Sequence, residues 1–377
     1  MSDVLVVGAG IVGAAVAREL AVRGVAVTLL DRGEVSSGTT GLGEGNVLLS
    51  DKDTGPELEL ARAGLEVYAE LEERMPEDAR IRRKGALIVH PDEATWAGEP
   101  ARLGRLGVAG AELLDADAVR DAEPALTGPI RGASFFPGDL QCDPRRIARA
   151  LAREAAAAGA EIRAGCDVAA LEPGRGARTR TGLIPGETVV LAAGPWSAGL
   201  ARTAGHHLPI EPRKGQLVQL AASRPGMVGH KVVDGSYLAS VTSAHAGLEV
   251  STVVETTWEG DVLVGSSRER RGFDLSVDPE VSDALVTRAA LLFGELAALP
   301  VRAAWSGLRP WLPDHLPAIG PSRAVPGLWL ATGHEGAGVG LGPVTGRLIA
   351  QLYCGEEAVV DPSPFDPDRF AAVTTTG

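Results

Sequence analysis

Residues 4–13 read VLVVGAGIVG, and AAVARELAVRG follows them at 14–24. The four apolar residues at the start predict a buried strand. The mostly apolar run after the glycines, with a few charged residues, predicts a helix that ends at Gly24. A second apolar run, 26–30, predicts another strand with Asp31 at its end. The chain therefore opens with a strand–helix–strand unit of the kind that binds dinucleotides.

The spacing of the glycines in this unit assigns each of them a steric task. Gly8 permits a tight turn, Gly10 lets the backbone approach a pyrophosphate, and Gly13 lets helix and strand pack closely. The helix N-terminus supplies free N–H groups for the phosphates, and Asp31 would accept hydrogen bonds from ribose hydroxyls. The fingerprint by itself does not separate NAD from FAD. The contacts expected from this unit are Gly8, Gly10, Ile11, Val12, Gly13, Asp31 and Arg32.

Composition excludes several classes of protein. The net charge of −13 argues against an extended nucleic-acid footprint, and the one cationic run, RERR at 268–271, is interpreted as a solvated loop. The three cysteines form no CxxC pair, which fits a reducing compartment. No apolar segment approaches the ~20 residues that a membrane span needs. We therefore expect a cytoplasmic protein with no nucleic-acid partner and no membrane span, and a homo-oligomer is compatible with the sequence.

Two further segments are expected to reach the nucleotide. The loop RGEVSSGTTGLGEGNVLL at 32–49 is too long to be a simple turn, and its hydroxyls and amides could continue the phosphate contacts. The stretch ETVVLAAGPWSAGLA at 187–201 predicts a strand that runs into a turn of small residues, which brings backbone close to a ligand. The contacts expected from these segments are Thr39, Thr40, Gly45, Asn46, Ala193, Gly194 and Trp196.

The rest of the chain predicts an α/β protein with two interleaved parts. Helices are expected at 56–74, 144–158 and 279–297, and strands at 85–90 and from Glu161 onward. Between 213 and 275 the pattern changes to β segments, including one at 230–241, which predict a mainly antiparallel sheet. We expect a Rossmann-type nucleotide-binding domain from residues 1–84, 140–212 and 304–377, and a smaller substrate domain from 85–139 and 213–303.

Six motifs in order carry a resemblance over almost the whole chain: VVGAGIVGAAVAREL, VLAAGPWS, PRKGQLV, DVLVGSS, WSGLRPWLPDHLPAIGP and GLWLATGHEGAGVGLGPVTGRLIA. Together they resemble the D-amino-acid oxidase/glycine oxidase family of FAD-dependent oxidoreductases. GHEGAGVG, at 333–340, is most similar to the flavoprotein subunits of dye-linked hydroxyproline dehydrogenases. The resemblance implies FAD and oxidation of a C–N bond next to a carboxylate. Monomeric sarcosine oxidase attaches FAD through a cysteine in the stretch corresponding to SGLRPW, where this chain has none, so the FAD is expected to be non-covalent.

The resemblance also implies roles for individual residues. Arg309 matches the arginine that pairs with the substrate carboxylate, although a structural salt bridge is the alternative. The second glycine-rich turn would wrap the flavin ring, and the helix after it would point its N-terminus at the ring. In this turn His334 is expected to contribute mainly backbone, with its imidazole as a local brace. The residues matched to the turn are Gly333, His334, Gly336, Gly338, Val339 and Gly340.

Three positions keep two interpretations each. Tyr237 is either a substrate contact or a half-buried tyrosine of the sheet, and His230 is a capping or surface histidine or a substrate contact. Glu335 either pairs with a nearby arginine or faces the pocket and selects the substrate. Glycine oxidases carry an aromatic residue and an arginine where this chain has Glu335 and Gly336, which argues against simple glycine as the substrate.

Three functions are compatible with these observations. The preferred one is oxidation of a small amino acid, imino acid or N-substituted glycine by hydride transfer to flavin N5, with Arg309, Tyr237 and Glu335 as the catalytic candidates. A second is a flavoprotein subunit that passes electrons to a partner protein. The third, an NAD-dependent dehydrogenase, leaves GHEGAGVG without a role.

Overall fold

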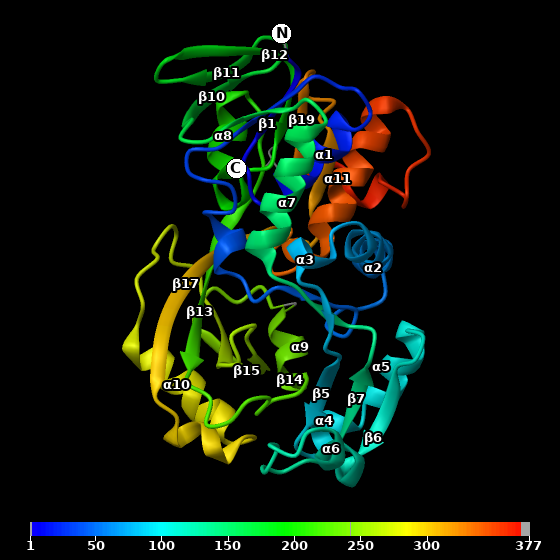
Figure 1. Ribbon diagram of the computed structural model, residues 1–377, viewed down its shortest axis with the longest axis vertical. Coiled ribbons are helices and arrows are strands. Elements are labelled where there is room, and N and C mark those ends of the chain that lie inside the picture. The colour runs from blue at the N-terminus through cyan, green and yellow to red at the C-terminus, as the bar shows by residue number, and fades with distance from the viewer. Residues whose placement is uncertain (1, 242, 371–377) are drawn as a thin grey trace.

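The structure is a computed structural model that describes residues 2–241 and 243–370. Two eight-stranded sheets form its two halves, which lie one above the other in Figure 1. Residues 1 and 371–377 of the predicted nucleotide-binding domain lie outside the described residues.

The first sheet contains the strand–helix–strand unit. Its path runs β10-β11-β12-β1-β2-β9, with β19 beside β12 and β18 beside β19. β1 pairs in parallel with both β2 and β12, so the turn after β1 lies at the carboxyl edge of a parallel sheet, where such sheets bind ligands. The strands are β1 (Ser2–Val7), β2 (Val27–Leu30), β9 (Glu161–Arg163), β10 (Val168–Glu172), β11 (Gly176–Thr179), β12 (Gly182–Leu191), β18 (Ala318–Pro321) and β19 (Leu328–Thr332).

Three helices cover this sheet, and a fourth lies beside them. α1 (Ile11–Ala21) packs against both α7 (Pro144–Ala157) and α11 (Gly338–Cys354). α2 (Pro56–Arg74) packs on α11 and has the predicted bounds. α7 begins where expected because Asp143 caps it, accepting hydrogen bonds from the amides of Arg145 and Arg146.

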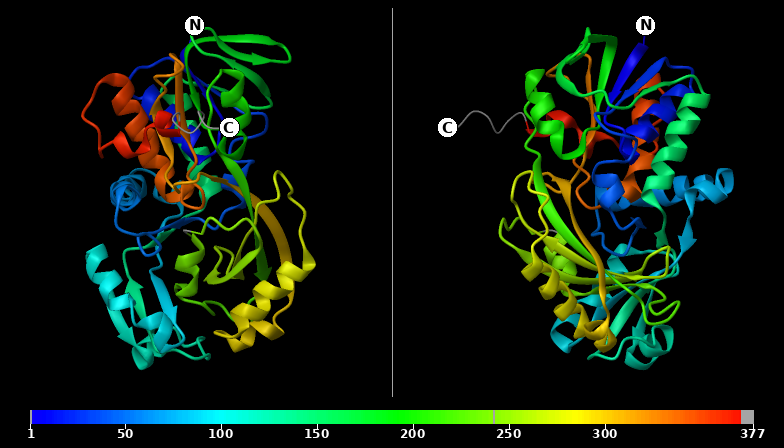
Figure 2. Two further views of the ribbon diagram at one scale, coloured as in Figure 1. Left: turned by 180° about the vertical axis from the view of Figure 1, so that it is seen from behind. Right: turned by 60° about the vertical axis from the view of Figure 1, so that its left-hand side comes forward.

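The second sheet confirms the predicted change to mainly antiparallel pairing. Its order is β17-β13-β16-β15-β14-β5-β7-β6, in which β14 and β5 run parallel and the other neighbours antiparallel. The long strands β13 and β17 run from the junction of the two halves along one side of the second half (Figures 1 and 2). The strands are β5 (Ala86–His90), β6 (Glu112–Asp115), β7 (Gly132–Phe136), β13 (Glu211–Leu220), β14 (Lys231–Asp234), β15 (Glu249–Thr256), β16 (Val262–Arg268) and β17 (Val301–Trp311).

The junction is bridged by a small sheet and several short helices. The small sheet joins β3 (Asn46–Val47), β8 (Leu140–Gln141) and β4 (Arg82–Arg83).

The division into two domains stays a prediction. Its boundary at residue 304 cuts β17, which lies whole in the second sheet. The remaining helices are η1 (Thr39–Leu42), α3 (Pro76–Ala79), α4 (Glu93–Trp96), α5 (Glu99–Leu106), α6 (Ala116–Ala122), η2 (Gly194–Trp196), α8 (Ser197–Thr203), α9 (Ser236–Val241), α10 (Pro279–Ala290), η3 (Gly294–Ala298) and η4 (Ser363–Phe365).

Two expected elements differ from the structure. The strand expected at 230–241 stops at Asp234, because the Asp234 carboxylate accepts a hydrogen bond from Ser236 N at 2.8 Å and turns the chain into α9. The helix expected at 279–297 ends at Ala290, and Phe293, with φ −120° and ψ 81°, separates it from η3. Tyr237 therefore lies on a helix rather than on a sheet.

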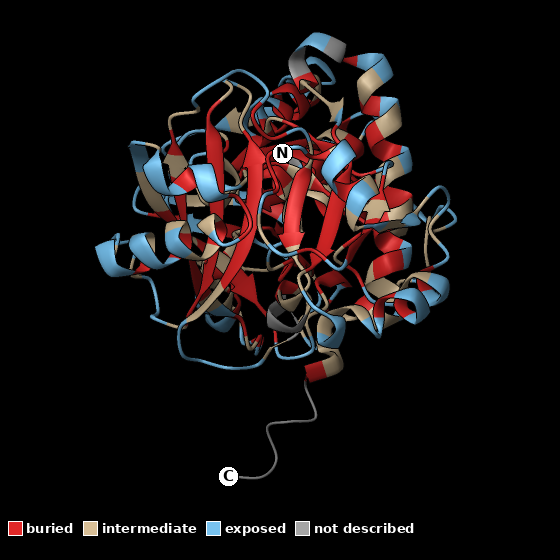
Figure 3. Ribbon diagram, turned by 90° about the horizontal axis from the view of Figure 1, so that it is seen from below, coloured by how far each residue is buried: buried red, intermediate tan, exposed pale blue. Residues whose placement is uncertain are grey.

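One hydrophobic cluster extends from the first half into β5, β7, β14 and β15, and another lies within the second half. The buried strands stand out from the exposed outer faces of the helices in Figure 3. In the described part of the chain, no helix combines the length and apolarity that crossing a bilayer would require.

α1 and α11 touch through a glycine. A Cβ added to Gly346 of α11 would lie 2.5 Å from the carbonyl carbon of Ala15 in α1 and 2.7 Å from its Cβ. The two helices can approach this closely only because position 346 has no side chain.

We predict that Gly346→Ala destabilises the protein by roughly 1–3 kcal/mol, because the added methyl group overpacks the contact with the α1 backbone. The exposed Gly104 of α5, whose Cβ would meet nothing within 4 Å, is the matched control. Gly104→Ala should stabilise by about 0.5–1 kcal/mol. Thermal unfolding at one fixed FAD concentration measures both, and equal shifts in the two variants would contradict the packing argument.

Candidate functional site

A cavity of about 950 Å³ is lined by residues from both sheets. It brings together the predicted residues of the first turn, the 32–49 loop, the turn after β12, the 333–340 turn, and Arg309, Tyr237 and Glu335. Two of the predicted residues, Gly13 and Gly333, do not line the cavity. A Cβ on Gly13 would lie 1.8 Å from Gly8 O, and one on Gly333, at φ 83°, would lie 2.3 Å from Leu312 Cδ1. Both glycines are therefore required by packing within the protein.

One end of the cavity is built around the N-terminus of α1. Gly8 has φ 108°, and a Cβ there would lie 2.4 Å from Ala192 O, so the turn closes against the end of β12. The Asp31 carboxylate accepts hydrogen bonds from the amides of Ala9 and Gly33, each at 2.7 Å. Thr40 Oγ1 accepts from Ile11 N at 3.0 Å. Backbone amides and an acid at the end of β2 thus surround this end.

The turn after β19 brings a second helix N-terminus to the same cavity. Gly338, Val339 and Gly340 begin α11 and line the wall. His334 Nε2 lies 2.9 Å from Thr345 Oγ1 of α11, which is the local brace expected from the sequence. Burial lowers the pKa of His334 to about 3, so its ring is neutral at pH 7. Two positive helix ends therefore open toward one space.

Arg309 lines the cavity from β17 of the second sheet. A Cβ on Gly215 of β13 would lie 2.1 Å from Arg309 Nη1, so the guanidinium lies directly on that glycine. Nη1 donates to Ser267 O at 3.0 Å, which is a carbonyl rather than a carboxylate. Burial, together with the positive charge of Arg268, lowers the pKa of Arg309 to about 10, so the side chain remains a cation at neutral pH.

Arg268 shows that the interpretation of RERR as a solvated loop is wrong at its first residue. Arg268 is the last residue of β16, only 4% exposed, and it lines the cavity. Its guanidinium carbon lies 4.6 Å from the centre of the Tyr237 ring. The solvated interpretation fits Arg271, whose side chain is 59% exposed. The alternation that places Ser266 on the cavity wall continues to Arg268, and this period of two was the signal that could have found it.

Glu335 pairs with an arginine, as one of its two interpretations expected, and it also lines the cavity. Its Oε1 lies 2.7 Å from Arg213 Nη1 and its Oε2 lies 3.0 Å from His315 Nδ1. Burial would raise the pKa of Glu335, but His315 and Arg213 outweigh it and lower that pKa. Arg213 is fully buried on β13 and was not found from the sequence. The carboxylate lines the cavity while it is held from behind.

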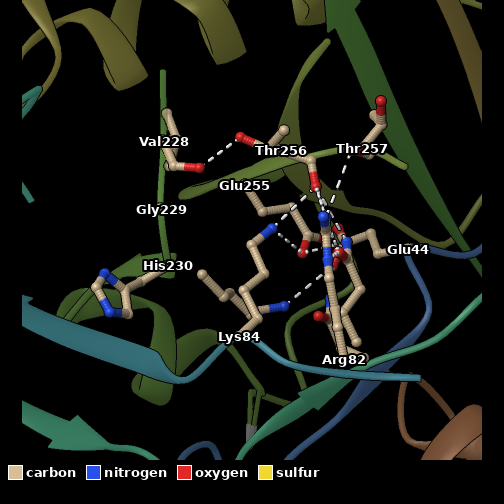
Figure 4. Close-up of polar contacts among 12 residues, drawn as sticks. Glu44, Arg82, Lys84, Val228, Gly229, His230, Glu255, Thr256 and Thr257 are labelled. Atoms are coloured by element: carbon tan, nitrogen blue, oxygen red, sulfur yellow. Dashed lines mark hydrogen bonds and ion pairs between the residues drawn. The ribbon is translucent and has the colours of Figure 1, made fainter. Parts of the chain in front are cut away.

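Glu44 and Lys231 form an ion pair on the cavity wall that sequence reasoning also missed. Glu44 Oε2 accepts from Lys231 Nζ at 3.1 Å and from Asn46 Nδ2 at 2.9 Å. Burial would raise the pKa of Glu44, but the Lys231 charge outweighs it and lowers that pKa. The polar network continues behind the wall, where Glu255 binds Asn46 at 3.0 Å and Lys84 at 3.2 Å (Figure 4).

Tyr237 and His230 have different surroundings. Tyr237 is 9% exposed, lies on α9 and lines the cavity beneath Arg268. His230 lies in the loop before β14, where its Nδ1 is 3.2 Å from Glu123 Oε2, and it is not among the residues that line the cavity. The structure therefore favours the local role for His230.

Comparison with known proteins identifies the family of the chain. The family model described as "DAO: FAD dependent oxidoreductase" matches residues 3–352. A glycine oxidase from Pseudomonas aeruginosa is 32% identical, covering 97% of this chain and 98% of its own. The crystal structure of glycine oxidase from Geobacillus kaustophilus superposes with a TM-score of 0.86 at 29% identity, covering 98% of both chains. That of iminodiacetate oxidase from Chelativorans sp. gives 0.83 at 25% identity, covering 97% of this chain and 98% of its own.

The cavity fits the cofactor of this family. It is lined by the N-termini of both α1 and α11, whose amides suit the anionic groups of a dinucleotide. Added Cβ atoms would obstruct the turns at Gly8 and at Gly10, where one would lie 3.0 Å from Thr40 Oγ1. FAD is the cofactor, and the chain belongs to the DAO family of FAD-dependent oxidoreductases.

Proposed function

We propose that this enzyme oxidises the C–N bond of a small amino acid, imino acid or N-substituted glycine. The observation that carries the proposal is Arg309, a cation that β17 of the second sheet holds on the cavity wall. The names of two relatives, glycine oxidase and iminodiacetate oxidase, support substrates in which an amine stands next to a carboxylate.

In this proposal Arg309 binds the substrate carboxylate. The arginine is fixed between two glycines, with Gly215 beneath the guanidinium and Gly336 3.8 Å from its Nε if given a Cβ. One nitrogen is held by Ser267 O, so the planar group is oriented before substrate arrives. A carboxylate accepts two hydrogen bonds from such a fork, which fixes its plane as well as its position.

FAD, when bound, supplies the acceptor for the hydride that leaves the carbon next to nitrogen. We propose that its contacts are the predicted glycine-turn and loop residues that line the cavity, and that the ring lies near the N-terminus of α11. Glu44 accepts a hydrogen bond from the substrate nitrogen, and Lys231 keeps that carboxylate ionised. The nitrogen must be neutral when hydride leaves, and an imine product that is neither cyclic nor conjugated hydrolyses to an oxo acid and an amine or ammonia.

The proposal is tested by anaerobic mixing of the purified enzyme with D- and L-amino acids, prolines and N-alkylglycines. We expect the flavin absorbance to bleach with at least one amine that carries an adjacent carboxylate. Reoxidation by oxygen and by an artificial dye, measured side by side, then identifies the acceptor class. If no member of the panel bleaches the flavin, the proposed function is wrong.

We predict that Arg309→Met raises KM for the carboxylate substrate by roughly 100-fold, because a buried charge-assisted pair is lost. Flavin content should stay near that of the wild type, since Arg309 belongs to the second sheet and not to the glycine turns proposed to hold the cofactor. Arg309→Lys should recover only part of the affinity, because lysine lacks the planar fork. An unchanged KM in both variants would leave Arg309 as a structural residue.

Glu335→Gln is predicted to act on stability rather than on the substrate. The substitution removes a charge that fully buried Arg213 faces at 2.7 Å, which should cost roughly 1–3 kcal/mol. We expect a lower Tm and weaker flavin retention, while the exposed Glu357→Gln control behaves like the wild type. A selective rise in KM with unchanged Tm would show instead that Glu335 acts on the substrate.

A further inference from the structure

We infer that Arg268 is a second carboxylate-binding residue, and that the substrate is an amine carrying two carboxylates. One carboxylate binds Arg309 and the other binds Arg268. The inference rests on the proposed function for the amine and for Arg309. It adds the second anionic group, and it assigns that group to a residue that no motif marked.

The strand order brings the two guanidinium groups to one place. β13 lies between β17, which carries Arg309, and β16, which carries Arg268. At the crossing point β13 has Gly215, so the Arg309 side chain lies across that strand and reaches Ser267 O, in the residue next to Arg268. Both arginines line the cavity.

The cations around the nearby acids outnumber them, because the positive charges of Lys231, Arg309 and Arg268 all lower the pKa of Glu44. Glu44 is bound by Lys231 at 3.1 Å, and Glu335 is bound by Arg213 at 2.7 Å. A substrate with one carboxylate brings one negative charge to a site with two arginines, whereas a dicarboxylate brings one for each. Because like charges repel strongly in a half-buried site, the second carboxylate gives a dianion an advantage that a monoanion lacks.

The position of Arg268 suits ligand binding. Its guanidinium carbon lies 4.6 Å from the centre of the Tyr237 ring, and this cation–π contact limits the rotation of the side chain. The edge of the guanidinium carries the N–H groups that a carboxylate accepts. Tyr237 is thereby a positioning residue for Arg268. Substitution of Tyr237 should therefore change the binding of the second carboxylate and leave the binding of the first unchanged.

The first test measures binding without turnover. Acetate and propionate are titrated against malonate, succinate and glutarate, and the perturbation of the flavin spectrum gives Kd. At least one dicarboxylate should bind the wild type roughly 10- to 100-fold more tightly than the monocarboxylates, as expected for one further charge-assisted pair. Arg268→Gln should remove this preference, and Arg268→Lys should retain part of it.

Arg271→Gln is the matched control. It removes the same charge from the same RERR run, but its side chain is exposed and pairs with Glu269 at 3.0 Å. The preference for dicarboxylates should persist in this variant. Flavin content and Tm are recorded for every variant, and if Arg268→Gln does not retain flavin, the wild-type series and Arg268→Lys decide the question.

The second test locates the second carboxylate on the substrate. Anaerobic flavin reduction by N-methylglycine is compared with that by iminodiacetate, and reduction by D- and L-alanine with that by D- and L-aspartate and glutamate. A preference in the first pair places the second carboxylate on the nitrogen substituent, and a preference in the other set places it on the side chain. Tyr237→Phe should keep the preference, while Tyr237→Ala should weaken it.

Failure of the inference and failure of the proposed function give different results. If monocarboxylates bind and react as well as dicarboxylates, or if Arg268→Gln keeps the preference, the inference is wrong even though amine oxidation is established. If no amine reduces the flavin but dicarboxylates still bind through Arg268, the proposed function is wrong and the anion-binding assignment stands.

Discussion

Close packing of α1 through glycine is the constraint on which the cavity depends. Gly13 meets Gly8 O on one side of α1, and Gly346 of α11 meets the Ala15 backbone on another. A side chain at either position would push the helix away from its neighbour, because protein interiors have no spare volume. With both contacts made, the N-termini of α1 and α11 open into the same space. Two segments more than 300 residues apart in the chain thus present positive helix ends to one cofactor.

The strand register of the second sheet positions the Arg309 side chain. Antiparallel pairing sets Gly215 of β13 opposite Gly307 of β17, two residues before Arg309. The bare backbone at Gly215 is the surface on which the Arg309 guanidinium lies, and the next strand supplies Ser267 O to hold it. A cation held by strands rather than by a loop has little freedom to reorient. This rigidity is the preorganisation that oriented binding requires.

The buried charges at the junction of the two halves form a connected set. Glu44 comes from the loop before β3, the uncharged Asn46 begins β3 and links the charges, Lys84 follows β4, and Glu255 belongs to β15 of the second sheet. Burying any one of these charges alone would be costly, but each has a partner of opposite charge or a hydrogen bond. Lys231 and Arg213 lower the pKa values of Glu44 and Glu335, so these two acids stay ionised beside the arginines of the site.

The sequence by itself determined the cofactor half of this protein. The fingerprint, α2, the start of α7 and the change to an antiparallel sheet follow local rules of spacing, capping and periodicity, which short stretches carry in full. The resemblance carried by six motifs identified the family. Only the tertiary structure decided the partners of Glu335, the Glu44–Lys231 pair and the place of Arg268, because these depend on which strands become neighbours. RERR contains the same letters whether its first arginine faces water or a cavity, and only the pairing of β16 with β13 and β15 turns it inward.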